Sequence, residues 1–189
     1  DDGLAGERPN EPVRPIDLGV EVDEAKAALG FTLFHDPRLS VDNTVSCATC
    51  HALETAGVDN HQYSHGVDDQ VGGVNAPTVY NAVYNFVQFW DGRAKTLADQ
   101  AAGPPLNPIE MASPSFDDII AKLKADKAFA KEFKAVYPDG LTEANITNAI
   151  EEFERTLITP NSRFDKWLRG DDSALTAEEL SGYELFKQY

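Results

Sequence analysis

Two cysteines and a histidine lie close together in the segment Cys47-Ala48-Thr49-Cys50-His51. The C-x-x-C-H pattern is typical of the covalent attachment of a c-type haem. Two thiols on one helical turn can each bond a vinyl group of the porphyrin, and the adjacent imidazole can then bind the iron. The chain has no other cysteine, so neither thiol has a further partner for a structural disulfide. The motif therefore predicts a haem held by Cys47, Cys50 and His51.

Paired cysteines also serve two other chemistries. A C-x-x-C pair suits thiol redox sites and half of a zinc site, and His61 and His65 could complete a zinc site on paper. A redox pair of the thioredoxin type should begin a helix after a buried strand, whereas residues 36–44 are polar and rich in turn formers. Haem attachment is the favoured interpretation, and zinc binding and a disulfide are the alternatives.

The composition restricts the classes of partner. The 189 residues are 42% hydrophobic and 25% charged, which is ordinary for a globular protein of one or two domains. No apolar run reaches the roughly 18 residues of a membrane span. The net charge of −16 disfavours nucleic acid, because phosphates repel an acidic surface. Such a surface would suit a basic or dipolar electron-donor protein, or would serve solubility alone.

The N-terminal sequence Asp1-Asp2-Gly3-Leu4 lacks the basic and apolar regions of an export signal, as expected of a mature start. Bacteria attach haem c outside the cytoplasm. The haem prediction therefore places the protein in the periplasm.

The periodicity of apolar residues predicts an all-α fold, because no alternating strand of useful length occurs. The clearest helix runs from about Thr142 to Ile158, with apolar residues at the spacing of one helical face. Thr176-Ala177-Glu178-Glu179 is a capping box that begins a last helix. Further helices are expected at 23–34, 47–51, 79–86 and 94–102, and from Ser115 onwards. Residues 55–77 form a long loop that holds two of the four histidines.

A set of motifs follows in order along residues 23–165. They are Leu29-Gly30, Leu33-Phe34-His35-Asp36-Pro37-Arg38-Leu39-Ser40, Ser46-Cys47-Ala48-Thr49-Cys50-His51, Asn75-Ala76-Pro77-Thr78, Gln88-Phe89-Trp90-Asp91-Gly92-Arg93, Gln100-Ala101-Ala102-Gly103-Pro104 and Glu110-Met111. In these motifs the sequence resembles the N-terminal half of bacterial di-haem cytochrome c peroxidases.

The resemblance implies a domain organisation. Residues 1–22 would be an extended N-terminal arm, and 23–163 a cytochrome c-like helical domain that carries the peroxidatic haem. Residues 164–189 would be a linker and the first helix of a second, truncated haem domain, because no second C-x-x-C-H is present. One haem c is then expected in this chain, and a second in the full-length protein.

The resemblance also implies the iron ligands. His51 would be the proximal ligand. The family's distal ligand is a histidine that precedes a glycine in the following loop, and Ser64-His65-Gly66 fits that position. His65 is therefore the expected distal ligand, and His61 is its competitor.

Four further residues take roles from the resemblance. Glu110 would act as the acid and base on peroxide, and Gln100 would orient peroxide or water. Trp90 would lie in the electron path between the haems, with an ordinary core aromatic as the alternative. Asn75 matches a family residue that helps to bind calcium, although it could also be a turn residue before Ala76-Pro77.

The expected function is that of a periplasmic cytochrome c peroxidase, which reduces hydrogen peroxide to water with electrons from a small cytochrome c or a cupredoxin. Members of the family often form homodimers. One alternative is a non-enzymatic electron-transfer cytochrome, with Met111 as an axial ligand beside His51. Another is a different di-haem oxidase of the same superfamily, such as the enzyme that matures a tryptophan-derived quinone.

Overall fold

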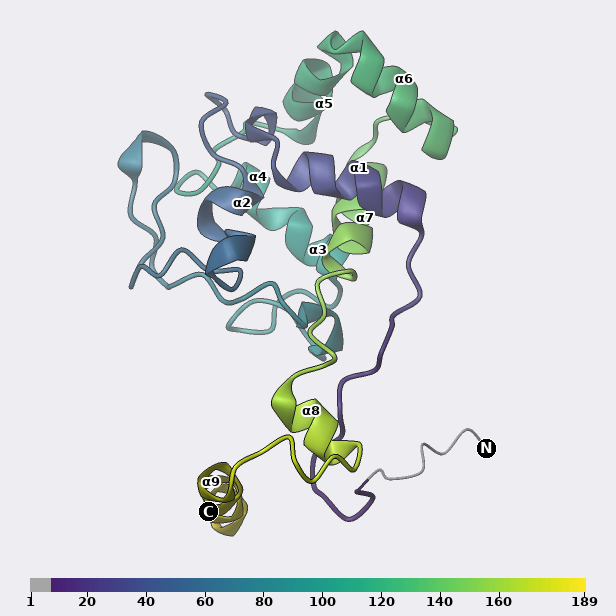
Figure 1. The fold of residues 1–189 in the computed structure, drawn as a ribbon. Helices are drawn as coiled ribbons and strands as arrows, with labels where there is room; N and C mark the ends of the chain where they lie inside the picture. Colours follow the sequence, from purple (N-terminus) through teal and green to yellow (C-terminus); the bar gives the residue numbers. More distant parts are fainter. Residues whose placement is uncertain (1–7) are drawn as a thin grey trace. The chain divides into compact units, whose positions relative to one another are not determined.

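The computed structural model describes residues 8–189, which form helices joined by loops. The helices are α1 (Glu24–Phe34), α2 (Cys47–Cys50), α3 (Leu97–Ala101), α4 (Gly103–Leu106), α5 (Phe116–Ala125), α6 (Lys127–Val136), α7 (Glu143–Glu154), α8 (Arg163–Leu168) and α9 (Ala177–Gln188) (Figure 1). The only β-pairing among these residues is two isolated bridges. The prediction of an all-α fold is confirmed. None of the described helices combines the length and the apolarity that crossing a membrane requires.

The chain divides into two compact units. The larger unit is Glu21–Leu157, and the smaller one combines the segment that ends at Val20 with Ile158–Tyr189. The expected boundaries at 22 and 163 stay a prediction, and residues 1–7 of the expected arm lie outside the described residues.

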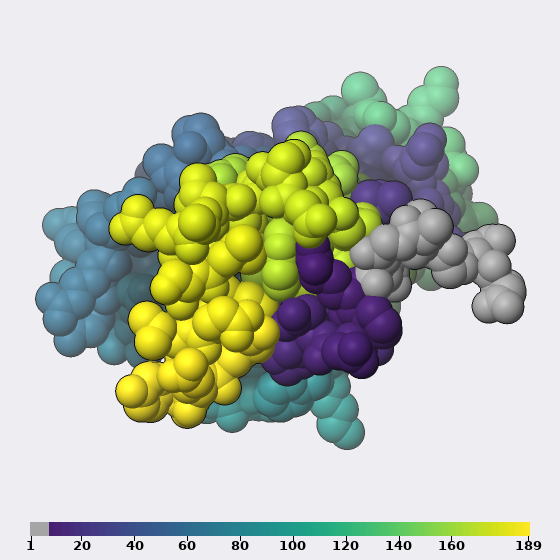
Figure 2. Space-filling view, turned by 60° about the horizontal axis from the view of Figure 1, so that its bottom comes forward, coloured from purple at the N-terminus to yellow at the C-terminus, as the bar shows by residue number. Residues whose placement is uncertain are grey.

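The smaller unit joins residues 8–20 to the C-terminal segment. Residues 8–20 contain no helix and lie against the C-terminal segment, as Figure 2 shows in purple and yellow. The guanidinium carbon of Arg8 lies 4.3 Å from the ring centroid of Trp167, and the amide of Ile16 donates to Asp165 at 2.8 Å. The predicted capping box of α9 is present.

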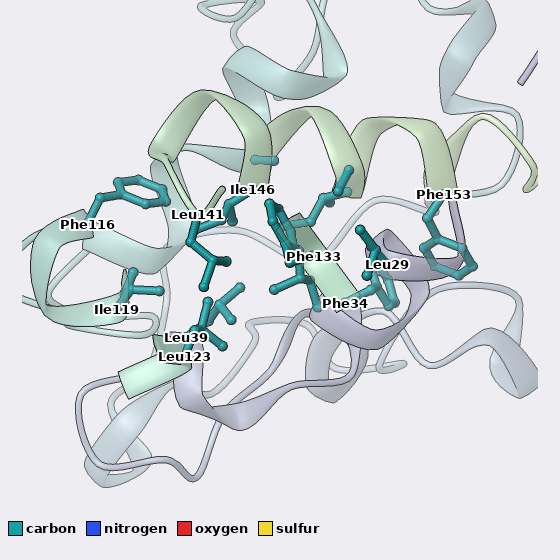
Figure 3. Close-up of a cluster of buried hydrophobic side chains, with 14 of the residues drawn as sticks. Leu29, Phe34, Leu39, Phe116, Ile119, Leu123, Phe133, Leu141, Ile146 and Phe153 are labelled. Carbon is teal, nitrogen blue, oxygen red and sulfur yellow. The ribbon is translucent and has the colours of Figure 1, made fainter. Parts of the chain in front are cut away.

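In the larger unit, α1 packs mainly against α7, as Figure 1 shows. Asp23 caps α1 by accepting hydrogen bonds from two amides of its first turn, and Thr142 caps α7 by accepting one from the amide of Asn145. The predicted apolar face of α7 is buried, and Phe153 meets Phe34 of α1 edge to face at 5.2 Å between ring centroids. The two helices thereby form the centre of a continuous core (Figure 3).

A glycine permits the close approach of α1 and α7. A methyl group on Gly30 would lie 1.8 Å from the carbonyl oxygen of Ala149 and 2.8 Å from the Cβ atom of Phe153. Both distances are below van der Waals contact, so any larger residue at position 30 must separate the helices.

Two of the expected helices differ from the structure. The predicted helix at 79–86 is wrong, because Asn81 adopts a left-handed conformation and only a 3-10 turn at Ala82–Tyr84 follows it. The helix expected at 94–102 begins only at Leu97, after Ala94 has paired with Gln88 as a bridge.

The glycine and prolines at 103–105 follow the end of α3 and open α4. Proline is tolerated in a first helical turn because the amides there have no partner within the helix. The short helices α6 and α8 were not predicted.

We expect Gly30→Ala to lower the free energy of unfolding by about 1–3 kcal/mol, because the added methyl group overpacks the crossing of α1 and α7. Urea unfolding followed by circular dichroism measures this change. Gly182→Ala is the matched control in α9, where an added methyl group meets nothing within 4 Å. That control should be neutral or stabilise the protein by up to about 1 kcal/mol. Equal effects of the two substitutions would contradict the packing argument.

Candidate functional site

A cavity of about 460 Å³ lies within the larger unit. Its volume falls in the range of about 300–1,000 Å³ that is typical of cofactor and small-molecule sites. All of the predicted site residues line it: Cys47, Cys50, His51, His65, Asn75, Trp90, Gln100 and Glu110. The fold therefore brings together side chains from α2, α3 and three loops that are distant in sequence.

The two cysteines lie on the single turn of α2. Ser46 and Thr49 form a capping box at its start, and three residues of separation place both thiols on one side. Burial raises the pKa of the Cys47 thiol to about 12, and burial also raises the pKa of Cys50. Reactive redox cysteines have a lowered pKa. The thiol redox alternative therefore finds no support in this environment.

The imidazole of His51 is anchored by backbone carbonyl groups, those of Gly57 and Pro77. Its Nδ1 lies 3.2 Å from the carbonyl oxygen of Gly57, which can only accept, so Nδ1 carries a proton. Burial lowers the pKa of His51, which favours the neutral ring. A neutral imidazole anchored through one nitrogen is the usual form of an iron-binding histidine.

His65 lies on a loop that contacts α2. Its carbonyl oxygen is 3.9 Å from Cys50 Sγ, and its side chain, 42% exposed, has Nδ1 at 2.5 Å from a carboxylate oxygen of Asp69. The ring of His61 lies 5.5 Å from that of His65, but His61 does not line the cavity. Position thus favours His65 over His61, and its role as a ligand stays a prediction.

The His65 loop is tied to the segment that carries Glu110. The amide of Val67 donates to the Glu110 carbonyl oxygen at 2.9 Å. A methyl group on Gly66 would lie 2.0 Å from the carbonyl oxygen of Ile109. The glycine after the histidine is therefore required by this backbone contact.

The carboxyl group of Glu110 is only partly shielded from solvent. Burial raises its pKa, whereas the hydrogen bond from Asn107 and the charge of Arg93 lower it. Asn107 Nδ2 donates to Oε1 at 2.6 Å. Since Oε1 is engaged, Oε2 is the oxygen left to exchange a proton. Gln100 is partly buried on α3 and lines the same cavity.

Trp90 is not a core aromatic, because 65% of its surface is exposed. Its indole nitrogen donates to the carbonyl oxygen of Asn75 at 3.1 Å, which brings together two of the predicted site residues. The preceding Phe89 has a positive φ of 65°, which is rare for a bulky residue and often marks a functional site. The guanidinium carbon of Arg93 lies 3.5 Å from the Phe89 ring centroid.

The geometry does not add support for the predicted metal sites or for Met111 as an axial ligand. Among the described residues, no group of three or more His, Cys, Asp or Glu side chains could hold a metal ion. Asn75 is exposed, and its calcium role stays a prediction. Met111 is 2% exposed, belongs to the hydrophobic core and also lines the cavity.

Glu154 is a site residue that the sequence analysis missed. It is 5% exposed, lines the cavity, and its Oε2 has no hydrogen-bond partner among the described residues. Burial and the nearby charge of Glu151 raise the pKa of Glu154 to about 8. An unsatisfied buried polar group costs about 1–3 kcal/mol. The sequence contains one sign of this burial: Glu154 lies four residues after Ile150, and therefore on the apolar face of α7.

These residues fit a covalently bound haem. The cavity wall supplies two uncharged thiols on one turn, a neutral imidazole, and a carboxyl oxygen that has no hydrogen-bond partner among the described residues. Cys47, Cys50 and His51 would hold the group, as the motif predicts.

Comparisons with known proteins agree with this fit. The sequence profile of the family described as di-haem cytochrome c peroxidase matches residues 24–173. The chain is 62% identical over 183 residues to cytochrome c peroxidase Ccp of Escherichia coli (strain K12), covering 97% of this chain and 39% of that protein. It is 49% identical over 180 residues to cytochrome c551 peroxidase of Nitrosomonas europaea, covering 94% of this chain and 53% of the relative.

A solved structure agrees in fold. The crystal structure of a MauG-like protein associated with microbial copper homeostasis has a TM-score of 0.81 and 30% sequence identity, covering 95% of this chain and 53% of that one. The chain thus spans about half, or less, of the length of these relatives. A profile match over most of the chain and a 62% identical relative establish that this chain belongs to the di-haem cytochrome c peroxidase family.

Proposed function

We propose that this chain is the peroxide-reducing haem domain of a periplasmic cytochrome c peroxidase. The observation that carries the proposal is the convergence of every predicted haem and catalytic residue on one cavity. The 62% identity to a protein named cytochrome c peroxidase supports the same activity. The overall reaction takes one hydrogen peroxide, two electrons and two protons to two waters.

The residues of the cavity have separate roles in the proposed reaction. Cys47 and Cys50 would hold the haem, and His51 would bind its iron through Nε2, because its Nδ1 proton is committed to Gly57. When bound, the haem supplies an iron centre that binds peroxide and passes electrons to it. Glu110 removes a proton from peroxide at Oε2 and returns it to the departing oxygen. Gln100 orients the peroxide through its amide group.

Access of peroxide depends on the loop that carries His65. We place His65 as the distal ligand of the resting enzyme. In this structure Nδ1 of His65 contacts Asp69, and 42% of the side chain is exposed. Movement of this short loop would bring His65 to the haem iron or withdraw it, and would thereby control the access of peroxide.

Electrons are proposed to come from a small cytochrome c or a cupredoxin. The exposed indole of Trp90 fits a position in the path from the second haem of the full-length protein. The net charge of −16 favours a basic or dipolar donor, with attraction that weakens as salt rises. Calcium at Asn75 and a homodimer complete the proposal, on the resemblance to the family alone.

Covalent attachment tests the proposal directly. We expect the full-length protein, matured in a bacterial periplasm, to keep its haem c absorption at this site after acid–acetone extraction. The double variant Cys47→Ala/Cys50→Ala should lose that attachment, whereas Thr49→Ala should keep it because it removes neither thiol. The pyridine haemochrome spectrum and the intact mass measure the haem count. A metal other than iron at the two thiols would refute the proposal.

We expect Glu110→Gln to lower peroxide turnover by about 10²–10⁴-fold, because an amide cannot accept and return the proton. Steady-state reduction of hydrogen peroxide by the full-length enzyme measures the loss. Glu132→Gln, an exposed residue of α6, is the matched control and should retain the parent rate. A Glu110→Gln rate within about twofold of the parent would remove Glu110 from the proton transfer.

The hydrogen bond from Asn107 sets the pH range of the reaction. It stabilises the ionised form of Glu110, so Asn107→Ala should raise the pKa of that carboxyl group. Since the ionised form is the base, the acid limb of the pH profile of peroxide turnover should move to higher pH. Gln70→Ala is the control, because Gln70 donates to the carbonyl oxygen of Pro108 in the same segment at 2.9 Å. An unchanged Asn107→Ala profile would contradict the assignment.

A further inference from the structure

The proposed reaction leaves the most deeply buried carboxyl group of the cavity without a role. Glu154 is the last residue of α7, and its exposed fraction is 5%. Its Oε2 has no hydrogen-bond partner among the described residues, and its side chain lines the cavity. It lies within electrostatic reach of Cys47, since its charge contributes to the raised pKa of that thiol. A buried carboxyl group without a hydrogen-bond partner in this position is expected to interact with a group bound inside the cavity.

Among the described residues, the charge that acts on the pKa of Glu154 is that of an acid and not of a base. On its own helix the charged neighbour that acts on it is Glu151, another acid. The helices packed against α7 are α1 and α3, whose charged residues Glu24, Lys26 and Asp99 are not among the causes of the raised pKa of Glu154. From α2, the uncharged thiol of Cys47 lies within electrostatic reach. The remaining titratable or charged groups of the cavity are Cys50, His51, His65, Asp91, Arg93 and Glu110.

A haem attached at Cys47 brings a variable charge into this low-dielectric environment. The ferric core carries one positive charge more than the ferrous core. The ferric state therefore stabilises an ionised Glu154, and the ferrous state favours the protonated carboxyl group. By reciprocity, protonation of the carboxyl group makes reduction of the iron more favourable.

We propose that Glu154 is the proton site that is coupled to the reduction of this haem. When the haem gains one electron, the carboxylate of Glu154 takes up one proton from solvent, and it releases that proton when the electron leaves. The net charge of the cavity then stays constant through each electron transfer. The inference rests on the covalent haem of the proposed function, but it does not require peroxide reduction.

The coupling has a defined sign. Between the pKa values of Glu154 in the ferric and ferrous states, the midpoint potential must fall as pH rises, because reduction consumes a proton. Below both values the potential is constant and high, and above both it is constant and low. Burial and Glu151 already raise the pKa of Glu154 to about 8, so the ferric charge would bring its titration towards neutral pH.

The test is a spectroelectrochemical titration of the full-length protein, in which the midpoint potential of the haem at Cys47 and Cys50 is measured from about pH 5 to 9. We expect the reduction equilibrium to change by up to tenfold per pH unit, or 59 mV for one electron. Glu154→Gln should remove most of this slope and hold the potential near the acid plateau. Glu151→Gln, the matched loss of one charge on the same helix, should keep the slope.

A second measurement identifies the proton directly. The reduced-minus-oxidised infrared difference spectrum should show the C=O stretch of a protonated carboxyl group, shifted by ¹³C-glutamate and displaced in Glu154→Asp. If Glu154→Gln does not fold, this band decides the question, and its absence from the parent overturns the inference.

Two further outcomes are decisive. An equal slope in the parent and in Glu154→Gln, or loss of the slope in Glu151→Gln alone, overturns the role of Glu154 and leaves the proposed function intact. Absence of a covalent haem overturns both.

Discussion

The crossing of α1 and α7 is the contact on which the rest of the larger unit depends. Gly30 lets the two backbones approach closely, and the edge-to-face pair of Phe34 and Phe153 fills the space beside them. Both helices also face the cavity, because Phe34, Ile150 and Glu154 line it. One packing contact therefore sets both the core and a wall of the site. The loops that carry the other site residues have no comparable regular structure and are positioned against this frame.

Burial has different consequences for the two carboxyl groups of the cavity. Desolvation raises the pKa of both Glu110 and Glu154. At Glu110 a hydrogen bond from Asn107 and the charge of Arg93 oppose the effect, which keeps a base available. At Glu154 no such group intervenes, and the neighbouring Glu151 adds to the effect. Two acids in one cavity can thus have separate tasks, one in proton exchange with substrate and one in charge balance.

The sequence was sufficient for the parts of the fold that have strong local signals. Capping residues such as Asp23, Ser115 and Thr176 lie at helix starts. The spacing of apolar residues predicted the buried face of α7. The region 79–86 was misread because apolar composition cannot reveal that Asn81 adopts a left-handed conformation. The prolines of α4 can either end a helix or begin one, and only the chain direction in space decides between them.

The candidate site was predicted to a similar degree. The C-x-x-C-H motif identified its own three residues, and Gln100, Glu110 and His65 came from the resemblance to a family rather than from local spacing. Glu154 was not predicted as a site residue, because the periodicity of apolar residues does not identify an acid at a position on the apolar face. Its significance depends on Oε2 having no hydrogen-bond partner among the described residues, which is a three-dimensional property.

The backbone contact at Gly66 has a mechanical consequence. In the segment after His65, the amide of Val67 donates a hydrogen bond to the carbonyl oxygen of Glu110. Gly66 brings the two backbones together without an intervening side chain. A swing of the histidine loop must therefore either break this bond or drag the acid along with it. In the proposed mechanism, movement of His65 to admit peroxide would therefore also disturb Glu110, because the amide of Val67 connects the two segments.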